Sequence, residues 1–148
     1  MAVRHFNEPR DLAYSKQHSG LFQGKDSWID KNSRGIFAGR TQRDLFIFAM
    51  ALGKYRKQKS DLKDRQANIP VQTMAERQKW AVLSISLAGN NDLMCLKDEN
   101  TLYKEAERYA EEGLKILQSH ADKWGSEYPK FLEAELKEIL QKSESGTE

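Results

Sequence analysis

The densest group of positive charges in the sequence is the segment 54–59, which reads Lys-Tyr-Arg-Lys-Gln-Lys and places four cations around one aromatic ring. Lysine and arginine neutralise nucleic-acid phosphates, and an exposed tyrosine ring can stack on an unpaired base. Arg40 and Arg43 flank an expected helix start at Thr41, where free backbone N–H groups favour anions. The alternatives are a solubilising loop and a helix start that serves folding alone. The predicted nucleic-acid-binding residues are Arg40, Arg43, Lys54, Tyr55, Arg56, Lys57 and Lys59.

Residues suited to catalysis or metal binding are few and far apart. His5, His18 and His120 show no metal-ligand spacing, so we expect them to be surface histidines. Cys95 is the only cysteine and lies among apolar neighbours, which suits a buried, inert thiol in a reducing compartment. Neither of the common glycine-rich phosphate-binding motifs occurs. We therefore predict no catalytic residue, no metal, no cofactor and no enzyme activity.

Glutamates are abundant in the C-terminal half of the chain. Their spacing places most of them opposite the apolar stripes of the expected helices, which predicts a solvated helix face rather than a pair of catalytic carboxylates. These residues are Glu105, Glu111, Glu112, Glu133, Glu135 and Glu138.

The elements that position these residues are predicted to be helices. Residues 1–35 are less regular, with one short helix near 8–19. A helix at 42–52 is capped by Thr41 and Asp44, is apolar on every side, and is expected to end at Gly53. Polar residues 54–72 then form a long connection.

Three further helices are expected in the second half. The capping box of Thr73 and Glu76 starts a helix at 74–88, whose apolar face includes Trp80, Leu83 and Leu87 and whose end is at Gly89. A helix at 100–118 carries a clean apolar stripe. The stripe includes Gly113, which indicates that another backbone passes close by. The last helix, at 129–141, carries its inner stripe on Leu132, Leu136, Ile139 and Leu140.

The length of 148 residues suits one domain, so we expect an all-α, compact single-domain bundle of about five helices over 1–142, with a disordered tail at 143–148. No segment is apolar enough to cross a membrane and no secretory signal is visible, which makes the cytoplasm the expected location. Residues 1–65 hold 14 Lys and Arg against 7 Asp and Glu, whereas 66–148 hold 10 against 15. This asymmetry can steer an anionic partner, or it can let the two halves attract each other within one fold or across an oligomer.

Three stretches in this order resemble a known family. They are Ile36–Phe37–Ala38 leading to 43–53, then 80–88, then 93–96 followed by 109–117, with Asp44, Gly53, Tyr109, Ala110 and Gly113 as landmarks. They resemble the small prokaryotic proteins associated with Dnd systems, which attach sulfur to the DNA backbone as phosphorothioate and restrict DNA lacking it. The family offers no catalytic motif to transfer, so the resemblance implies a phage-defence setting rather than a reaction.

We predict a non-catalytic accessory or adaptor protein of such a DNA-modification system. It would act through contacts with a protein partner in the complex, and contacts with DNA are left open as an addition to them. The alternative is a stand-alone small nucleic-acid-binding protein that uses the basic segment 54–59. The small residues on the 100–118 stripe leave a homo-oligomer open as well, because they suit a dimer contact as readily as the interior of one chain.

Overall fold

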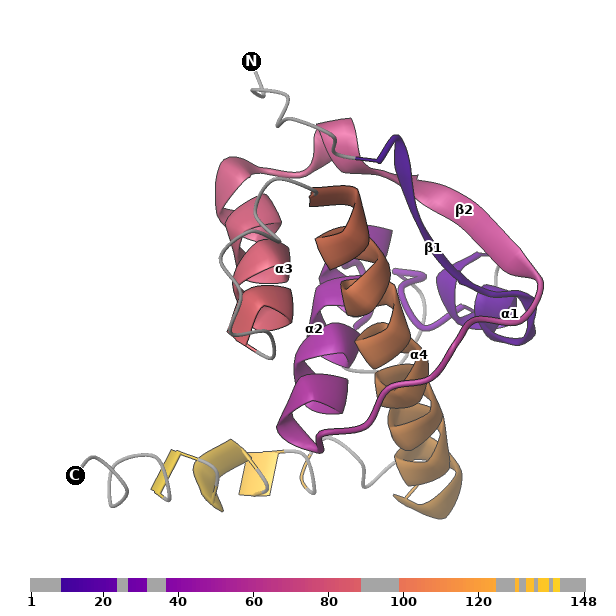
Figure 1. The fold of residues 1–148 in the computed structure, drawn as a ribbon. Helices are drawn as coiled ribbons and strands as arrows, with labels where there is room; N and C mark the ends of the chain where they lie inside the picture. The colour runs from indigo at the N-terminus through magenta and orange to yellow at the C-terminus, as the bar shows by residue number, and fades with distance from the viewer. Residues whose placement is uncertain are drawn as a thin grey trace. The chain divides into compact units, whose positions relative to one another are not determined.

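The computed structural model describes residues 9–23, 27–31, 37–88 and 99–124, together with 130, 133, 134, 136–138, 140 and 141 (Figure 1). The chain divides into two compact units, Met1–Ile116 and Leu117–Glu148. The elements in chain order are β1 (Asp11–Ser15), a 3-10 helix (Lys16–His18), α1 (Ser19–Phe22), α2 (Gln42–Tyr55), β2 (Arg65–Pro70), a second 3-10 helix (Val71–Thr73), α3 (Glu76–Ala88) and α4 (Glu99–Trp124). Among these residues, no helix is long and apolar enough to cross a bilayer.

Helix α2 begins where the sequence predicts. The Thr41 hydroxyl accepts a hydrogen bond from the backbone N–H of Asp44 at 3.2 Å, and the Asp44 carboxylate accepts one from the N–H of Thr41 at 3.1 Å. This reciprocal capping box satisfies two backbone donors that the first helical turn leaves unpaired. The predicted cap at Thr41 is confirmed.

The end of α2 differs from the prediction, because Gly53 lies inside the helix. The helix continues to Tyr55 and closes with the N–H of Lys57 donating to the Lys54 carbonyl and the N–H of Gln58 donating to the Gly53 carbonyl, both at 3.0 Å. Lys57 takes the left-handed conformation in this closure, with φ of 56°. The predicted stop at Gly53 is therefore wrong, and the basic segment begins as the last helical turn rather than as loop.

The two glycines of the core lie where α2 crosses α4. A Cβ atom on Gly113 would lie 1.7 Å from the carbonyl oxygen of Ala49, and one on Gly53 would lie 2.0 Å from the carbonyl oxygen of Tyr109. The two backbones are thus in direct contact, which only residues without a side chain allow. This confirms the close approach predicted at Gly113, and it places the small-residue stripe of α4 inside the chain.

Two short strands correct the prediction of an all-α fold. β1 pairs antiparallel with β2, with Leu12 opposite Ile69 and Ser15 opposite Arg65. The prediction assigned a helix near 8–19 and a long connection at 54–72. Positions 12–15 of β1 are all buried, so β1 lacks the polar–apolar alternation that marks a strand, and β2 is mostly exposed and polar. The fold is mostly helical with a two-stranded sheet.

Helix α3 also departs from the prediction at its start. Thr73 belongs to the preceding 3-10 helix and its hydroxyl donates to the Pro70 carbonyl at 2.8 Å, while the Gln78 side chain accepts the N–H of Ala75 at 2.9 Å. The predicted box between Thr73 and Glu76 is therefore not the cap. Leu83 is buried as expected, but Trp80 is 53% exposed.

The remaining predictions fall partly outside the described residues. Helix α4 extends beyond the predicted 100–118 at both ends. The described residues between 130 and 141 are helical, in keeping with the helix predicted there. The predicted stop at Gly89, the segment that contains Cys95, and the tail at 143–148 lie outside the described residues.

Candidate functional site

The predicted nucleic-acid-binding residues lie in two separate groups. Arg40 and Arg43 are at the start of α2, whereas residues 54–59 are at its end. A rise of 1.5 Å per residue places the backbones of Arg43 and Lys54 roughly 16 Å apart along the helix axis. Arg43 Nη1 donates to Thr73 Oγ1 at 3.0 Å, so this arginine ties α2 to the segment before α3. The seven residues do not converge on one site.

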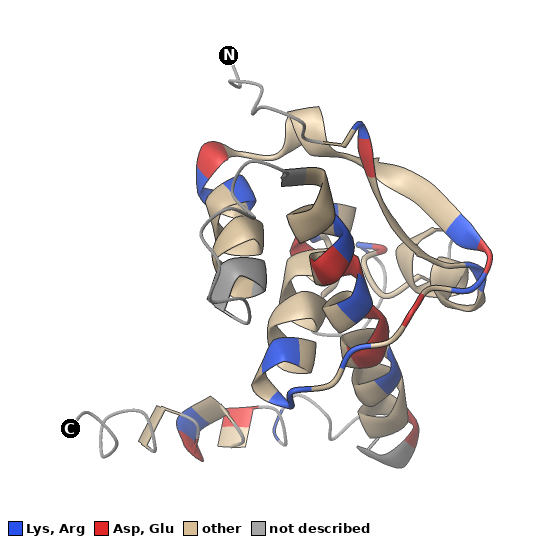
Figure 2. Cartoon of the chain, viewed as in Figure 1, with Lys and Arg blue, Asp and Glu red and all other residues tan. Residues whose placement is uncertain are grey.

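Two lysines of the basic segment pack against α4. Lys54 Nζ lies 5.1 Å and Lys59 Nζ 5.5 Å from the centre of the Tyr109 ring, within the range of a cation–π interaction. Lys59 also forms an ion pair with Glu105. Figure 2 shows Lys and Arg in blue at the end of α2 and Asp and Glu in red on the neighbouring α4. Lys54 and Lys59 therefore hold the end of α2 and the loop that follows it on α4.

Tyr55 and Lys57 are the members of this segment most available to a ligand. The Tyr55 ring is 46% exposed, and Arg56 covers it from 5.8 Å. Lys57 is exposed and, within residues 37–88 and 99–124, forms no ion pair. Its positive φ is a conformation that glycine adopts without cost and that lysine adopts at a cost of about 1 kcal/mol. An exposed, unpaired cation thus occupies a position where the backbone favours glycine.

Acidic side chains of α4 form a buried cluster that the sequence did not predict. Glu111 is 2% exposed and accepts hydrogen bonds from Ser15 Oγ at 2.7 Å and from Gln17 Nε2 at 3.2 Å. Its Oε1 lies 3.3 Å from His18 Nε2, and His18 is buried as well. The expectations of a solvated Glu111 and a surface His18 are wrong, because the 3-10 turn after β1 covers this part of α4.

Glu107 lies one turn earlier on α4, and residues of the sheet bind its carboxylate. Arg65 Nη2 donates to Glu107 Oε2 at 2.7 Å, Arg65 Nε donates to Oε1 at 3.2 Å, and the Ala13 N–H donates to Oε2 at 2.9 Å. Burial raises the pKa of Glu107, and the hydrogen bonds and charge of Arg65 offset only part of that effect. One residue of each strand therefore binds this carboxylate.

The pKa of Glu111 moves in the opposite direction. Burial acts to raise it, but the hydrogen bonds from His18, Ser15 and Gln17 together outweigh burial and hold the pKa below its usual value. Glu107 and Glu111 follow the buried Tyr103 by one and two helical turns. That spacing is the signal that could have identified them as inward-facing.

The geometry of this cluster suits structure rather than nucleophilic catalysis. In a catalytic triad the imidazole lies between the hydroxyl and the carboxylate and takes the proton of the hydroxyl. Here the Glu111 carboxylate lies between Ser15 and His18, so His18 does not contact the Ser15 hydroxyl. Across the described ranges, no three His, Cys, Asp or Glu side chains are placed to hold a metal ion. What the cluster does is fasten the sheet to α4.

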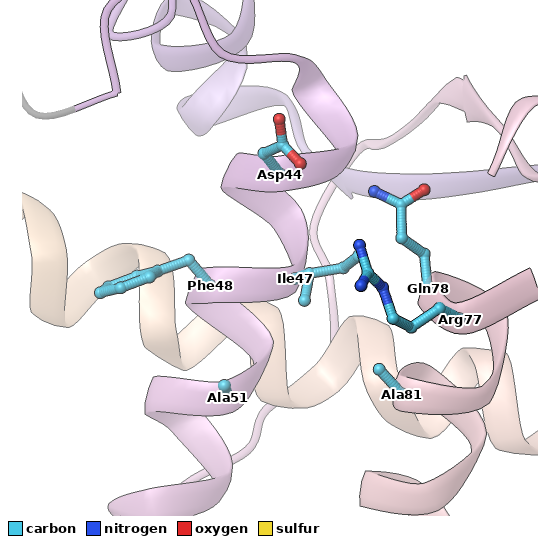
Figure 3. Close-up of a pocket in the computed structure, with 7 residues that line it drawn as sticks. All are labelled: Asp44, Ile47, Phe48, Ala51, Arg77, Gln78 and Ala81. Carbon is cyan, nitrogen blue, oxygen red and sulfur yellow. The ribbon is translucent and has the colours of Figure 1, made fainter. Parts of the chain in front are cut away.

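Among the residues that the structure describes, a groove between α2 and α3 is a further candidate site. It encloses about 400 Å³ and is lined mainly by apolar side-chain atoms. In Figure 3 Arg77 extends from α3 across the groove toward Ile47. On the opposite side, the Phe48 ring packs edge-on against Phe37 at 5.2 Å. The lining residues are Asp44, Ile47, Phe48 and Ala51 from α2, and Arg77, Gln78 and Ala81 from α3.

Sequence patterns did not predict this groove. The apolar run in α2 indicated a helix covered on all sides, yet Ala51 is exposed and Ile47 is only partly buried. An apolar helix face that remains uncovered has the same sequence pattern as one that is covered, so periodicity alone could not distinguish them.

Comparison with known proteins places these features in a family. A family model described as DNA sulphur modification system-associated protein 4 matches residues 12–148. No curated protein and no solved structure matches the chain. Since the match covers nearly the whole sequence, the chain belongs to the family of DNA sulphur modification system-associated protein 4, which confirms its resemblance to the Dnd-associated proteins.

Proposed function

We propose that this protein is a non-catalytic accessory component of a DNA sulphur modification system and acts there as an adaptor, in the cytoplasm, by binding a protein of the system. Membership of the family supports the setting, and the description of that family as associated with the system fits an accessory role. The observation that carries the adaptor mechanism is that the buried acidic cluster has a structural role. His18, Glu107 and Glu111 are the buried groups best suited to acid–base chemistry, and their hydrogen bonds hold the sheet on α4.

The test is genetic complementation in a host that carries the modification genes. The chromosomal copy is deleted and replaced by an affinity-tagged copy. Phosphorothioate in the DNA is then measured by mass spectrometry of nuclease digests, and restriction of unmodified DNA is measured by transformation efficiency. We expect deletion to change at least one of these two readouts and the tagged protein to co-purify with a component of the system. Normal readouts after deletion, together with no co-purifying component, would refute the proposal.

The distinction between adaptor and enzyme needs a second variant. Glu111→Gln keeps the shape and most hydrogen bonds of the cluster but removes the carboxylate. If the protein is an adaptor, the Glu111→Gln variant should still support modification and restriction at a temperature where the variant remains folded. Loss of function in a folded, abundant Glu111→Gln protein would favour an enzyme.

Contact with nucleic acid is the second candidate function, and the conformation of Lys57 is the observation that favours it. In the left-handed conformation of position 57, lysine is less stable than glycine would be. The property that lysine adds at this position is its positive charge. Beside it, Tyr55 offers a partly exposed ring. In this arrangement the end of α2 contacts phosphates through Lys57 and a base through Tyr55.

The test separates charge from backbone strain. Fluorescence anisotropy measures the affinity for single- and double-stranded DNA over a range of salt concentrations. Lys57→Gly and Lys57→Asn remove the charge and suit the left-handed backbone, and both should weaken binding and reduce the salt slope by about 1. Lys16→Gln, which removes an exposed cation beside the sheet, is the matched control. Equal affinity of all four proteins would discard this candidate.

A further inference from the structure

The groove between α2 and α3 is an apolar surface that the described part of the chain leaves open. Val82 and Leu83 are buried on the inner side of the helix, while Trp80 is 53% exposed and Ala81 lies in the groove. A helix with apolar residues on both sides is typical of a position between two other elements. Ala81 is therefore an apolar residue of α3 that lies in the groove rather than on the side that Val82 and Leu83 bury.

The groove is long and wide enough to bind one helix. Its α2 wall runs from Asp44 to Ala51, two helical turns or about 10 Å. Ala51 and Ala81 face each other at one end, and their short side chains allow a partner backbone to approach. A volume of about 400 Å³ takes one or two bulky apolar side chains spaced by one helical turn.

Charge at the other end of the groove specifies the partner. Arg77 is exposed and its guanidinium group lies over the groove (Figure 3), and Arg40 is exposed near the start of α2. Neither arginine forms an ion pair within residues 9–23, 27–31, 37–88 and 99–124. Asp44, the acidic residue of the lining, already accepts a hydrogen bond from the Thr41 N–H in the capping box. An acidic side chain on the partner would find Arg77 unpaired.

We propose that the α2–α3 groove binds an acidic amphipathic helix of a protein of the modification system, with a bulky apolar side chain between Ile47 and Ala81 and a carboxylate on Arg77. Arginine is among the residue types that most often dominate binding energy at protein interfaces. This inference rests on the adaptor function proposed above and adds the surface and the chemistry of the partner.

The experiment uses the full chain in its host. A photo-crosslinking amino acid replaces Ala81 in the groove or, as control, Gln118 on an exposed position of α4. We expect crosslinks from position 81, and not from 118, to a protein that the modification genes encode. Ala51→Glu and Arg77→Glu should each reduce that crosslink at least tenfold. Ala51 is exposed and glutamate is a good helix former, so Ala51→Glu should fold normally, which circular dichroism checks.

Two outcomes separate this inference from the adaptor function. If the protein co-purifies with the system but Ala51→Glu and Arg77→Glu leave co-purification unchanged, the adaptor function stands and the groove is not its surface. If nothing co-purifies with the wild-type protein, both fail together. Crosslinks to a second copy of the chain would replace the proposed partner with self-association.

Discussion

The close contact of α2 with α4 predicts that Gly113→Ala strongly destabilises the protein. The added Cβ would lie 1.7 Å from the carbonyl oxygen of Ala49 and 2.5 Å from its carbonyl carbon. Both atoms belong to the backbone of a capped helix, so no side-chain rotation can make room. The two helices would have to move apart by more than 1 Å, and the core residues on either side of the contact would lose their packing.

Two effects of opposite sign set the magnitude. Alanine is favoured over glycine inside a helix by about 1 kcal/mol, which acts to stabilise the variant. Overpacking a dense core typically costs about 1–3 kcal/mol, and a clash with a rigid backbone belongs at or above the upper end of that range. We expect a net loss of about 2–3 kcal/mol. For a chain of this length each kcal/mol lowers the melting temperature by about 2–4 °C, which gives a fall of roughly 4–12 °C.

The assay is urea denaturation followed by circular dichroism, with Gly20→Ala as the matched control. Gly20 lies in α1 and a Cβ there would meet no atom within 4 Å, so the control should be neutral or slightly more stable. Gly53→Ala should resemble Gly113→Ala, because its Cβ would lie 2.0 Å from the Tyr109 carbonyl oxygen. If Gly113→Ala is as stable as Gly20→Ala, the backbones of α2 and α4 are not in contact and the packing described above is wrong.

Substitutions at three further positions test the cap and the buried cluster by the same denaturation assay. Thr41→Ala should cost about 1 kcal/mol, because it removes the side-chain acceptor of the capping box; no loss would mean that α2 is capped in another way. Arg65→Met should cost about 2 kcal/mol, since it leaves the buried Glu107 carboxylate with one donor, and Arg65→Lys should cost less. Glu111→Gln should be destabilising at neutral pH. Because the folded-state pKa of Glu111 is lowered below 4.5, its contribution is complete above that pH and is lost as the pH falls through the folded-state pKa. The difference in stability from wild type should therefore shrink as the solution is made more acidic; a constant difference would contradict this.

The helical core could be read from the sequence because its signals are local. Thr41 and Asp44 are three residues apart, and their reciprocal hydrogen bonds follow from that spacing. Gly113 interrupts an apolar stripe at a position that alanine would otherwise favour, which is a local anomaly with a tertiary cause. Both of these local predictions are confirmed, whereas the equally local box predicted at Thr73 and Glu76 is not the cap of α3.

The sheet and the buried cluster could not be read because their partners are distant in the chain. Leu12 pairs with Ile69, and Ser15 contacts Glu111 across 96 positions. Neither strand shows alternation, since β1 is covered on both faces and β2 on little more than Ile69. The helix end predicted at Gly53 is wrong for a related reason. Glycine after an apolar run usually ends a helix, but here it is required by the Tyr109 backbone of another helix.

Contacts within the chain already cover part of the surface of some helices, which limits where a partner can bind. On one side α4 contacts α2 through Gly113, and on another it holds the sheet through Glu107 and Glu111, so a large part of its surface is used within the chain. The end of α2 is partly used too, because Lys54 and Lys59 pack on Tyr109. In α3 the situation is different, since Arg77 is exposed and Ala81 lines the groove. Substitutions in α4 should therefore act on function through stability, whereas those in α3 along the groove should change binding in a protein that remains fully folded.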